Sequence, residues 1–82
     1  VFLKRREYER AAQAYQTIID DYSEGIRVDN SLYALADLYE NYLDDPQRAM
    51  DLYETLFIDY SSSILAVEGR QNFRRLRGDD VQ

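Results

Sequence analysis

The side chains that could do chemistry in this chain are carboxylates, tyrosine hydroxyls and guanidinium groups. The 82 residues include no histidine and no cysteine, so imidazole bases, thiol nucleophiles and thiolate metal ligands are missing. The carboxylates Asp37 and Glu40 lie three residues apart on what reads as one open helix face. Acid–base catalysis would need an enclosed pocket that shifts their pKa values. The sequence therefore predicts a protein that is not an enzyme and holds no cofactor.

Two short motifs resemble known sites but fail on spacing or have a simpler explanation. Residues 20–25 superficially resemble a calcium loop, yet Tyr22 occupies a ligand position and Ser31 stands where a bidentate glutamate is needed. Residues 77–79 spell the integrin-type tripeptide Arg-Gly-Asp, but Gly78 is explained as the C-terminal cap of a helix. We expect no metal site and no integrin-type site.

The segment that must position these side chains contains an internal repeat. Residues 10–23 recur at residues 48–61, 38 residues further on, with the same Arg, Ala, Tyr, Thr, Asp, Tyr and Ser at corresponding places. A fixed period of about 20–50 residues indicates a helical repeat array. Such arrays bury a continuous core by stacking and usually serve as binding scaffolds.

Apolar residues at helical spacing predict four helices and no strand. The expected ranges are 8–22, from 26 or 28 to 43, 46–60 and 64–77, the last with an apolar stripe of Ile64, Val67, Phe73 and Leu76. Asp45 reads as an N-cap before Pro46, and the serines 61–63 offer a hydroxyl cap to the fourth helix. Residues 1–6 are ambiguous, and one reading makes Val1, Phe2 and Leu3 the stump of a preceding helix. Short connections predict antiparallel hairpins.

Two of these helices resemble a tetratricopeptide repeat. The pattern runs Leu32-x₂-Leu35-Ala36-x₂-Tyr39, then Ala49-x₃-Tyr53-x₂-Leu56, with Ser61 where proline is usual. Ala36 and Ala49 are small where two helices would approach closely. The resemblance implies an all-α, antiparallel helix-hairpin solenoid fragment of about two repeats and a C-terminal capping helix, which would act as a protein–protein interaction scaffold.

The resemblance covers nearly the whole chain as a single domain. It implies the second half of a repeat over 1–22, a full repeat over 26–60, a capping helix over 64–77 and a frayed tail over 78–82. The period of 38 residues exceeds the usual length of about 34 and resembles the longer repeats of bacterial cell-envelope proteins. These include the Tol–Pal cell-division coordinator and the outer-membrane assembly lipoprotein, which implies a location in the periplasm or cell envelope.

In this family the first helix of each repeat lines a concave groove. The resemblance places Asn30, Tyr33, Ala34, Asp37, Glu40 and Asn41 there, joined from the last helix by Glu68, Gln71, Asn72 and Arg75. The candidate partner-binding residues are Asn30, Tyr33, Asp37, Glu40, Asn41, Gln71 and Arg75. Tyr33 is the clearest candidate contact, because it lies one residue past the inward Leu32. Asp37 and Glu40 would repel a C-terminal carboxylate, which excludes the chaperone-tail type of ligand.

Charge limits the class of partner. The chain has a net charge of −6, with most carboxylates in residues 20–59 and the basic side chains mainly at the two ends. An acidic middle repels phosphate backbones, which argues against nucleic acid. No apolar run reaches the ~20 residues of a membrane span. We expect a basic or polar protein or peptide as the partner.

Two further hypotheses remain open. Arg74 stands at the small-residue position of the last helix, so this helix could be a purely structural C-terminal cap of a longer solenoid that binds no ligand of its own. If Val1 interrupts a helix, the first hairpin lacks its neighbour and leaves Ala11, Tyr15 and Ile18 uncovered. Exposed apolar stripes favour association, so we predict self-association through this N-terminal hairpin.

Overall fold

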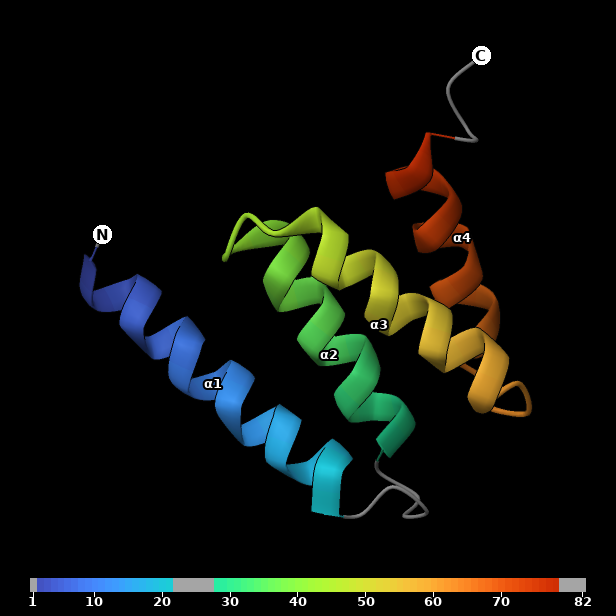
Figure 1. The fold of residues 1–82 in the computed structure, drawn as a ribbon, viewed down its shortest axis with the longest axis horizontal. Helices are drawn as coiled ribbons and strands as arrows, with labels where there is room; N and C mark the ends of the chain where they lie inside the picture. Colours follow the sequence, from blue (N-terminus) through green and yellow to red (C-terminus); the bar gives the residue numbers. More distant parts are fainter. Residues whose placement is uncertain (1, 22–27, 79–82) are drawn as a thin grey trace.

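The computed structural model describes residues 2–21 and 28–78 of the 82-residue chain (Figure 1). Within them the chain forms four helices and no strand, namely α1 (Phe2–Asp21), α2 (Val28–Asn41), α3 (Pro46–Asp59) and α4 (Ala66–Arg77). Successive helices run antiparallel and pack α1 on α2, α2 on α3 and α3 on α4 (Figure 1). The result is a thin layer of 35 × 35 × 15 Å, which confirms the predicted all-α hairpin fragment.

Local sequence signals set the boundaries of α3 and α4. Asp45 caps α3 by accepting a hydrogen bond from the Arg48 amide at 3.2 Å, and Pro46 is the first helical residue. Gly78 ends α4 at a φ of 97°, a left-handed conformation that favours glycine. Both features are as predicted from the sequence.

The beginning of α1 differs from the prediction. The helix starts at Phe2 rather than near residue 8, so residues 2–7 continue α1 and are not the stump of a separate helix. Glu7 and Tyr8 occupy the places that Asp45 and Pro46 occupy one period later. Without a capping residue and a proline, nothing in the sequence interrupts the helix there. The turn expected at residues 23–25 and the tail at 79–82 lie outside the described residues.

The core lies between α2 and α3. Its members are exposed by 1 % or less and comprise Val28, Leu32, Leu35, Ala36, Ala49, Tyr53 and Leu56. Ala36 and Ala49 share one buried cluster with Tyr53, as predicted for two helices in close approach. Among residues 4–21 of α1 only Ala12 is buried, against Leu35 and Leu43 of the next hairpin. Two neighbours therefore cover α3, whereas α1 lies at the edge of the layer.

The inward face of α4 follows only part of the predicted stripe. Phe73 and Leu76 pack against the cluster of Ala36, Ala49 and Tyr53, as predicted. Ile64 lies before the helix and is 90 % exposed, and Val67 is 64 % exposed. Ala66 and Gly69 are buried instead, because α4 begins only after a turn in which the Ser63 hydroxyl accepts a hydrogen bond from the Leu65 amide at 3.0 Å. A Cβ atom on Gly69 would lie 2.9 Å from Leu56 Cδ2, so the absence of a side chain allows α3 and α4 to pack closely.

Candidate partner-binding surface

One side of α2 carries the predicted groove residues. While Leu32, Leu35 and Ala36 turn into the core, the neighbouring side of the helix presents the half-buried Tyr33, Asp37 and Glu40. This division follows from the 3.6-residue period of the helix, because residues three or four positions apart share one face and the residues between them lie on another. The matching side of α4 carries Glu68, Asn72 and Arg75, spaced by four and then three residues.

Tyr33 joins the three helices α2, α3 and α4. Its hydroxyl donates a hydrogen bond to Glu68 Oε2 at 3.1 Å and accepts one from Asn72 Nδ2 at 3.2 Å. Its ring packs edge-on against that of Tyr53, with centroids 5.7 Å apart. Burial raises the pKa of the Tyr33 hydroxyl above its usual value, and the nearby Glu68 adds to this, opposed by the Asn72 hydrogen bond.

Glu40 forms a second link between the same helices. Its carboxylate is paired with Arg75, Nη2 to Oε2 2.6 Å, and accepts a hydrogen bond from the Tyr53 hydroxyl at 3.3 Å. The Glu40 side chain is 12 % exposed whereas that of Arg75 is 48 % exposed. Arg75 also donates to Asn72 Oδ1 at 3.3 Å. We call Tyr33, Glu40, Glu68, Asn72 and Arg75 the tyrosine network.

The remaining predicted residues lie beside this network or apart from it. Asn41 donates to Asp37 Oδ1 at 2.6 Å within α2. Asn30 is exposed near the start of α2, where its backbone N–H donates to the neighbouring Asp29 carboxylate at 2.8 Å. Gln71 lines a different hollow, with Phe57 and Arg70. Of the seven candidates, the structure thus pairs Glu40 with Arg75 directly and links Tyr33 to Arg75 through Asn72. Asp37 and Asn41 are adjacent on α2.

The Tyr53 hydroxyl was not among the predicted site residues. Apolar spacing correctly places the Tyr53 ring in the core, where the residue is 1 % exposed. Its hydroxyl nevertheless reaches Glu40, and burial, then the Glu40 charge, raises the pKa of this hydroxyl well above its usual range. A buried tyrosine requires a hydrogen-bond partner, which is the sequence signal that could have identified this contact.

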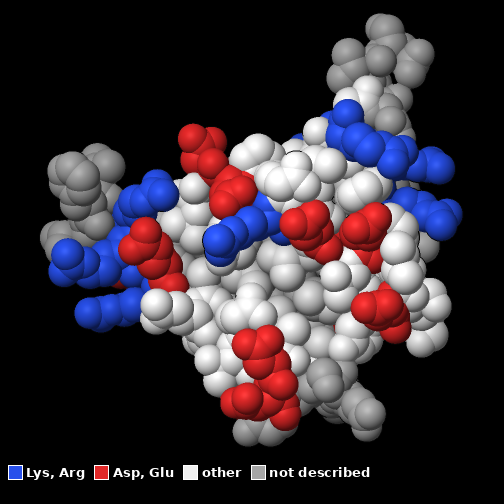
Figure 2. Space-filling view, viewed as in Figure 1, with Lys and Arg blue, Asp and Glu red and all other residues white. Residues whose placement is uncertain are grey.

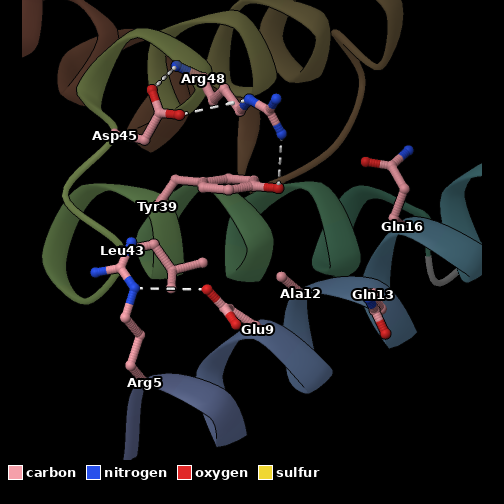
Figure 3. Close-up of a pocket in the computed structure, with 9 residues that line it drawn as sticks. All are labelled: Arg5, Glu9, Ala12, Gln13, Gln16, Tyr39, Leu43, Asp45 and Arg48. Atoms are coloured by element: carbon pink, nitrogen blue, oxygen red, sulfur yellow. Dashed lines mark hydrogen bonds and ion pairs between the residues drawn. The ribbon is translucent and has the colours of Figure 1, made fainter. Parts of the chain in front are cut away.

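A separate polar hollow lies between α1 and the α2–α3 turn (Figure 3). It has a volume of about 450 Å³, and its lining includes Ala12, Leu43, Gln13 and Gln16.

Arg48, at the start of α3, lies over the Tyr39 ring with its guanidinium 5.6 Å from the centroid, and pairs with Asp45 at 3.4 Å. On the other side of the hollow Arg5 pairs with Glu9 at 3.5 Å (Figure 3). Both arginines are thus neutralised locally, which leaves the hollow little net charge with which to select a ligand.

The described part of the chain contains no cluster of three or more histidine, cysteine, aspartate or glutamate side chains able to hold a metal ion. Over residues 2–21 and 28–78, no helix combines the length and apolar character that crossing a membrane requires. What the described surface offers is a set of hydrogen-bonding groups held in fixed positions by three helices.

The α2–α3 hairpin, with two alanines in contact and a tyrosine and leucine beside them, has the packing expected of one repeat unit. Residues 30–63 match the family model of the tetratricopeptide repeat. The match covers most of α2, all of α3 and the turn that follows, and it supports the family resemblance. Tetratricopeptide repeats generally mediate protein–protein interactions on a non-enzymatic scaffold. No curated protein and no solved structure matches the chain.

Proposed function

We propose that this protein is an interaction scaffold whose α2–α4 side binds a basic or polar polypeptide segment. The observation that carries this proposal is the tyrosine network, because it fixes Tyr33 of α2 beside Glu68 and Arg75 of α4 at one surface. Groups held by mutual hydrogen bonds lose little conformational freedom when a partner binds, which favours affinity. The matched tetratricopeptide repeat covers α3 and most of α2, the helices that supply Tyr53, Tyr33 and Glu40, and ends before α4.

The charge of this surface supports a basic or polar partner. Arg75 is already paired with Glu40 at 2.6 Å. Asp37 is bonded to an uncharged amide, and Glu68 to a tyrosine hydroxyl. The surface therefore keeps two carboxylates that no cation in the tyrosine network neutralises. Complementary charge raises the association rate and disfavours acidic partners.

Selection from a random peptide phage library, followed by calorimetric titration of the selected peptide, would test this proposal. The double variant Asp37→Lys/Glu68→Lys should weaken binding about tenfold or more, since each lost charge contact contributes roughly 1 kcal/mol. Glu40 is left unchanged because it holds α2, α3 and α4 together. The matched control Asp51→Lys/Glu54→Lys carries the same charge change on the exposed side of α3 and should bind as the wild type does. Equal loss in both variants, or no selected peptide, would contradict the proposal.

A purely structural end cap is the second candidate, and one observation favours it. α4 covers the Leu56 side of the core through Gly69, and it carries the exposed Arg74 at the position where α2 has the buried Ala36. An arginine at that position opposes close packing by a further helix. In this case the peptide selection should fail, while deletion of α4 should still unfold the α2–α3 hairpin.

Three narrower expectations accompany the scaffold proposal. The first is the domain division into a half repeat, a full repeat and a capping helix, which the resemblance to tetratricopeptide repeats implies. The second is the bacterial cell-envelope subtype, which the 38-residue spacing resembles. Self-association would use the α1 residues Ala11, Tyr15 and Ile18, which are half-buried. Light scattering over a wide concentration range would test this association, and a constant monomer mass would exclude it.

A further inference from the structure

A second charged surface lies on the side of α4 that faces away from the tyrosine network. Arg70, Arg74 and Arg77 are spaced by four and then three residues and therefore share one helix face. Two hollows of about 360 and 230 Å³ are both lined by Phe57, Arg70 and Arg74. Figure 2 shows basic side chains gathered over α4, whereas acidic side chains predominate across the middle of the molecule.

Aromatic rings hold two of these guanidinium groups in place. Arg70 lies over the Phe57 ring, 5.4 Å from its centroid, and Arg77 lies over Phe73 at 5.0 Å. The two phenylalanine rings in turn pack edge to face with centroids 5.4 Å apart. Arginine stays charged when it stacks on an aromatic ring. Because the stacked groups are already ordered, a partner pays less of the entropy cost of fixing them.

The internal repeat shows which chemistry this surface excludes. One period earlier, Arg70 and Arg74 correspond to Leu32 and Ala36 of α2, which are exposed by 1 % or less in the core shared with α3. A helix with an apolar face such as that of α3 would have to bury guanidinium groups without partners if it packed on α4 in the same way. Burying unpaired charge is costly. For the same reason, a second copy of the chain cannot pack the apolar side of its α1, which carries Ala11 and Ile18, on this face of α4.

An occupant of this surface must therefore supply carboxylates, and an apolar contact beside them. No carboxylate is among the described residues that line either hollow. Val67 lines the larger hollow and is 64 % exposed. Arginines that share one helix face match carboxylates that share one face of a second helix, since both sets then have the same spacing.

We propose that the surface formed by Phe57, Val67, Arg70, Arg74 and Arg77 binds an acidic amphipathic helix of a partner protein. Carboxylates of that helix pair with Arg70 and Arg74, and its apolar side chains cover Val67. This surface is distinct from the α2–α4 side, which favours a basic or polar segment. The proposal therefore does not depend on the function proposed above.

The test uses a synthetic helical peptide with glutamates spaced by four and three residues and leucines beside them. Fluorescence anisotropy of the labelled peptide should show saturable, salt-sensitive binding to the whole chain, and a version with every glutamate changed to glutamine should not bind. Arg70→Gln/Arg74→Gln should weaken binding about tenfold, with roughly 1 kcal/mol lost for each arginine. The control Arg6→Gln/Arg10→Gln changes two exposed arginines of α1 and should leave the affinity unchanged.

Further variants separate this surface from alternatives. If circular dichroism shows that the double variant loses helical content, the single variant Arg74→Gln replaces it. This variant preserves the stacking of Arg70 on Phe57 and should still weaken binding. Asp37→Lys/Glu68→Lys should not weaken binding of the acidic peptide. The proposal is overturned if wild type does not bind the peptide, if the α1 control loses as much affinity as the α4 variant, or if heparin competes as strongly as the peptide.

Discussion

The helices α1 and α3 contain nearly the same sequence segment and differ in how far they are buried. Ala49, Tyr53 and Leu56 of α3 are exposed by 1 % or less. Their counterparts one period earlier, Ala11, Tyr15 and Ile18, are all half-buried. α3 packs on both α2 and α4, whereas α1 packs mainly on α2. The burial of a repeat motif is thus determined by its neighbours as much as by its own residues.

This difference shows how stability is distributed along the layer. In repeat proteins each unit contributes its own stability and that of the contacts with its neighbours. Identical substitutions in α1 and α3 should therefore have unequal costs. Variant pairs at corresponding positions measure this inequality directly, because the residue types and the helix positions are matched.

The largest effect is expected for the tyrosine pair. Tyr53→Ala removes a fully buried ring and its hydrogen bond to Glu40, and should lower the free energy of unfolding by about 3–5 kcal/mol. Tyr15→Ala removes a half-buried ring and should cost roughly half as much. Urea denaturation followed by circular dichroism measures both. Equal costs would show that α1 is as well packed as α3.

Enlarging the first alanine of each repeat should also destabilise the protein more in α3 than in α1. Ala49→Leu inserts a bulky side chain into the contact with Ala36, where neither residue is exposed, and overpacking of this kind costs about 1–3 kcal/mol. Ala11→Leu has space at the half-buried edge and should change stability by less than about 0.5 kcal/mol. Thermal unfolding of the two variants side by side provides the comparison, and a destabilised Ala11 variant would contradict it.

Alkaline pH should weaken the α3 side of the layer. Burial raises the pKa of Tyr53 in the folded protein, so the folded state retains its phenolic proton at pH values where the unfolded chain, with a pKa of about 10, loses it. The resulting stability is complete below about pH 10 and is lost as pH rises above that value. Tyr53→Phe should be less stable than the wild type at neutral pH. Between about pH 9 and 11, roughly one unit on either side of the unfolded pKa, it should lose less stability than the wild type does. The same pH dependence in this variant would assign the effect to other groups.

The smallest effect concerns the helix starts. Asp45→Ala removes the side-chain cap of α3 and should cost about 1 kcal/mol. Glu7→Ala changes the corresponding position, which lies within α1 and is exposed, and should be nearly neutral. Chemical denaturation of both variants tests whether residue 45 begins a helix and residue 7 does not.

Local signals explain which parts of the fold were predictable. Asp45, Pro46 and Gly78 act within one helical turn, so their capping roles could be read from the sequence. The small residues Ala36 and Ala49 marked the closest helix contact. The start of α1 was predicted wrongly, because it depends on a missing interruption at Glu7. The stripe of α4 was right for Phe73 and Leu76 but wrong for Ile64 and Val67, because the turn that Ser63 forms delays the start of the helix.

The site was less predictable than the fold. Helical spacing placed Tyr33, Glu40 and Arg75 on suitable faces, but the pairing of Glu40 with Arg75 depends on how α2 and α4 lie across α3. The hydrogen bond between Tyr53 and Glu40 depends on how far the buried ring extends through the core, because this decides where its hydroxyl emerges. Such contacts join residues far apart in sequence, and no periodic pattern records which atoms meet.

The most direct test of the central claim is an NMR titration of the isotope-labelled protein with a basic peptide selected by phage display. If the α2–α4 side is a recognition surface, chemical-shift changes should concentrate at Asn30, Tyr33, Asp37 and Asn41, with Glu68 and Asn72 beside them. Changes confined to α1 or to the outer side of α3, or the absence of any saturable change, would contradict the proposed scaffold function.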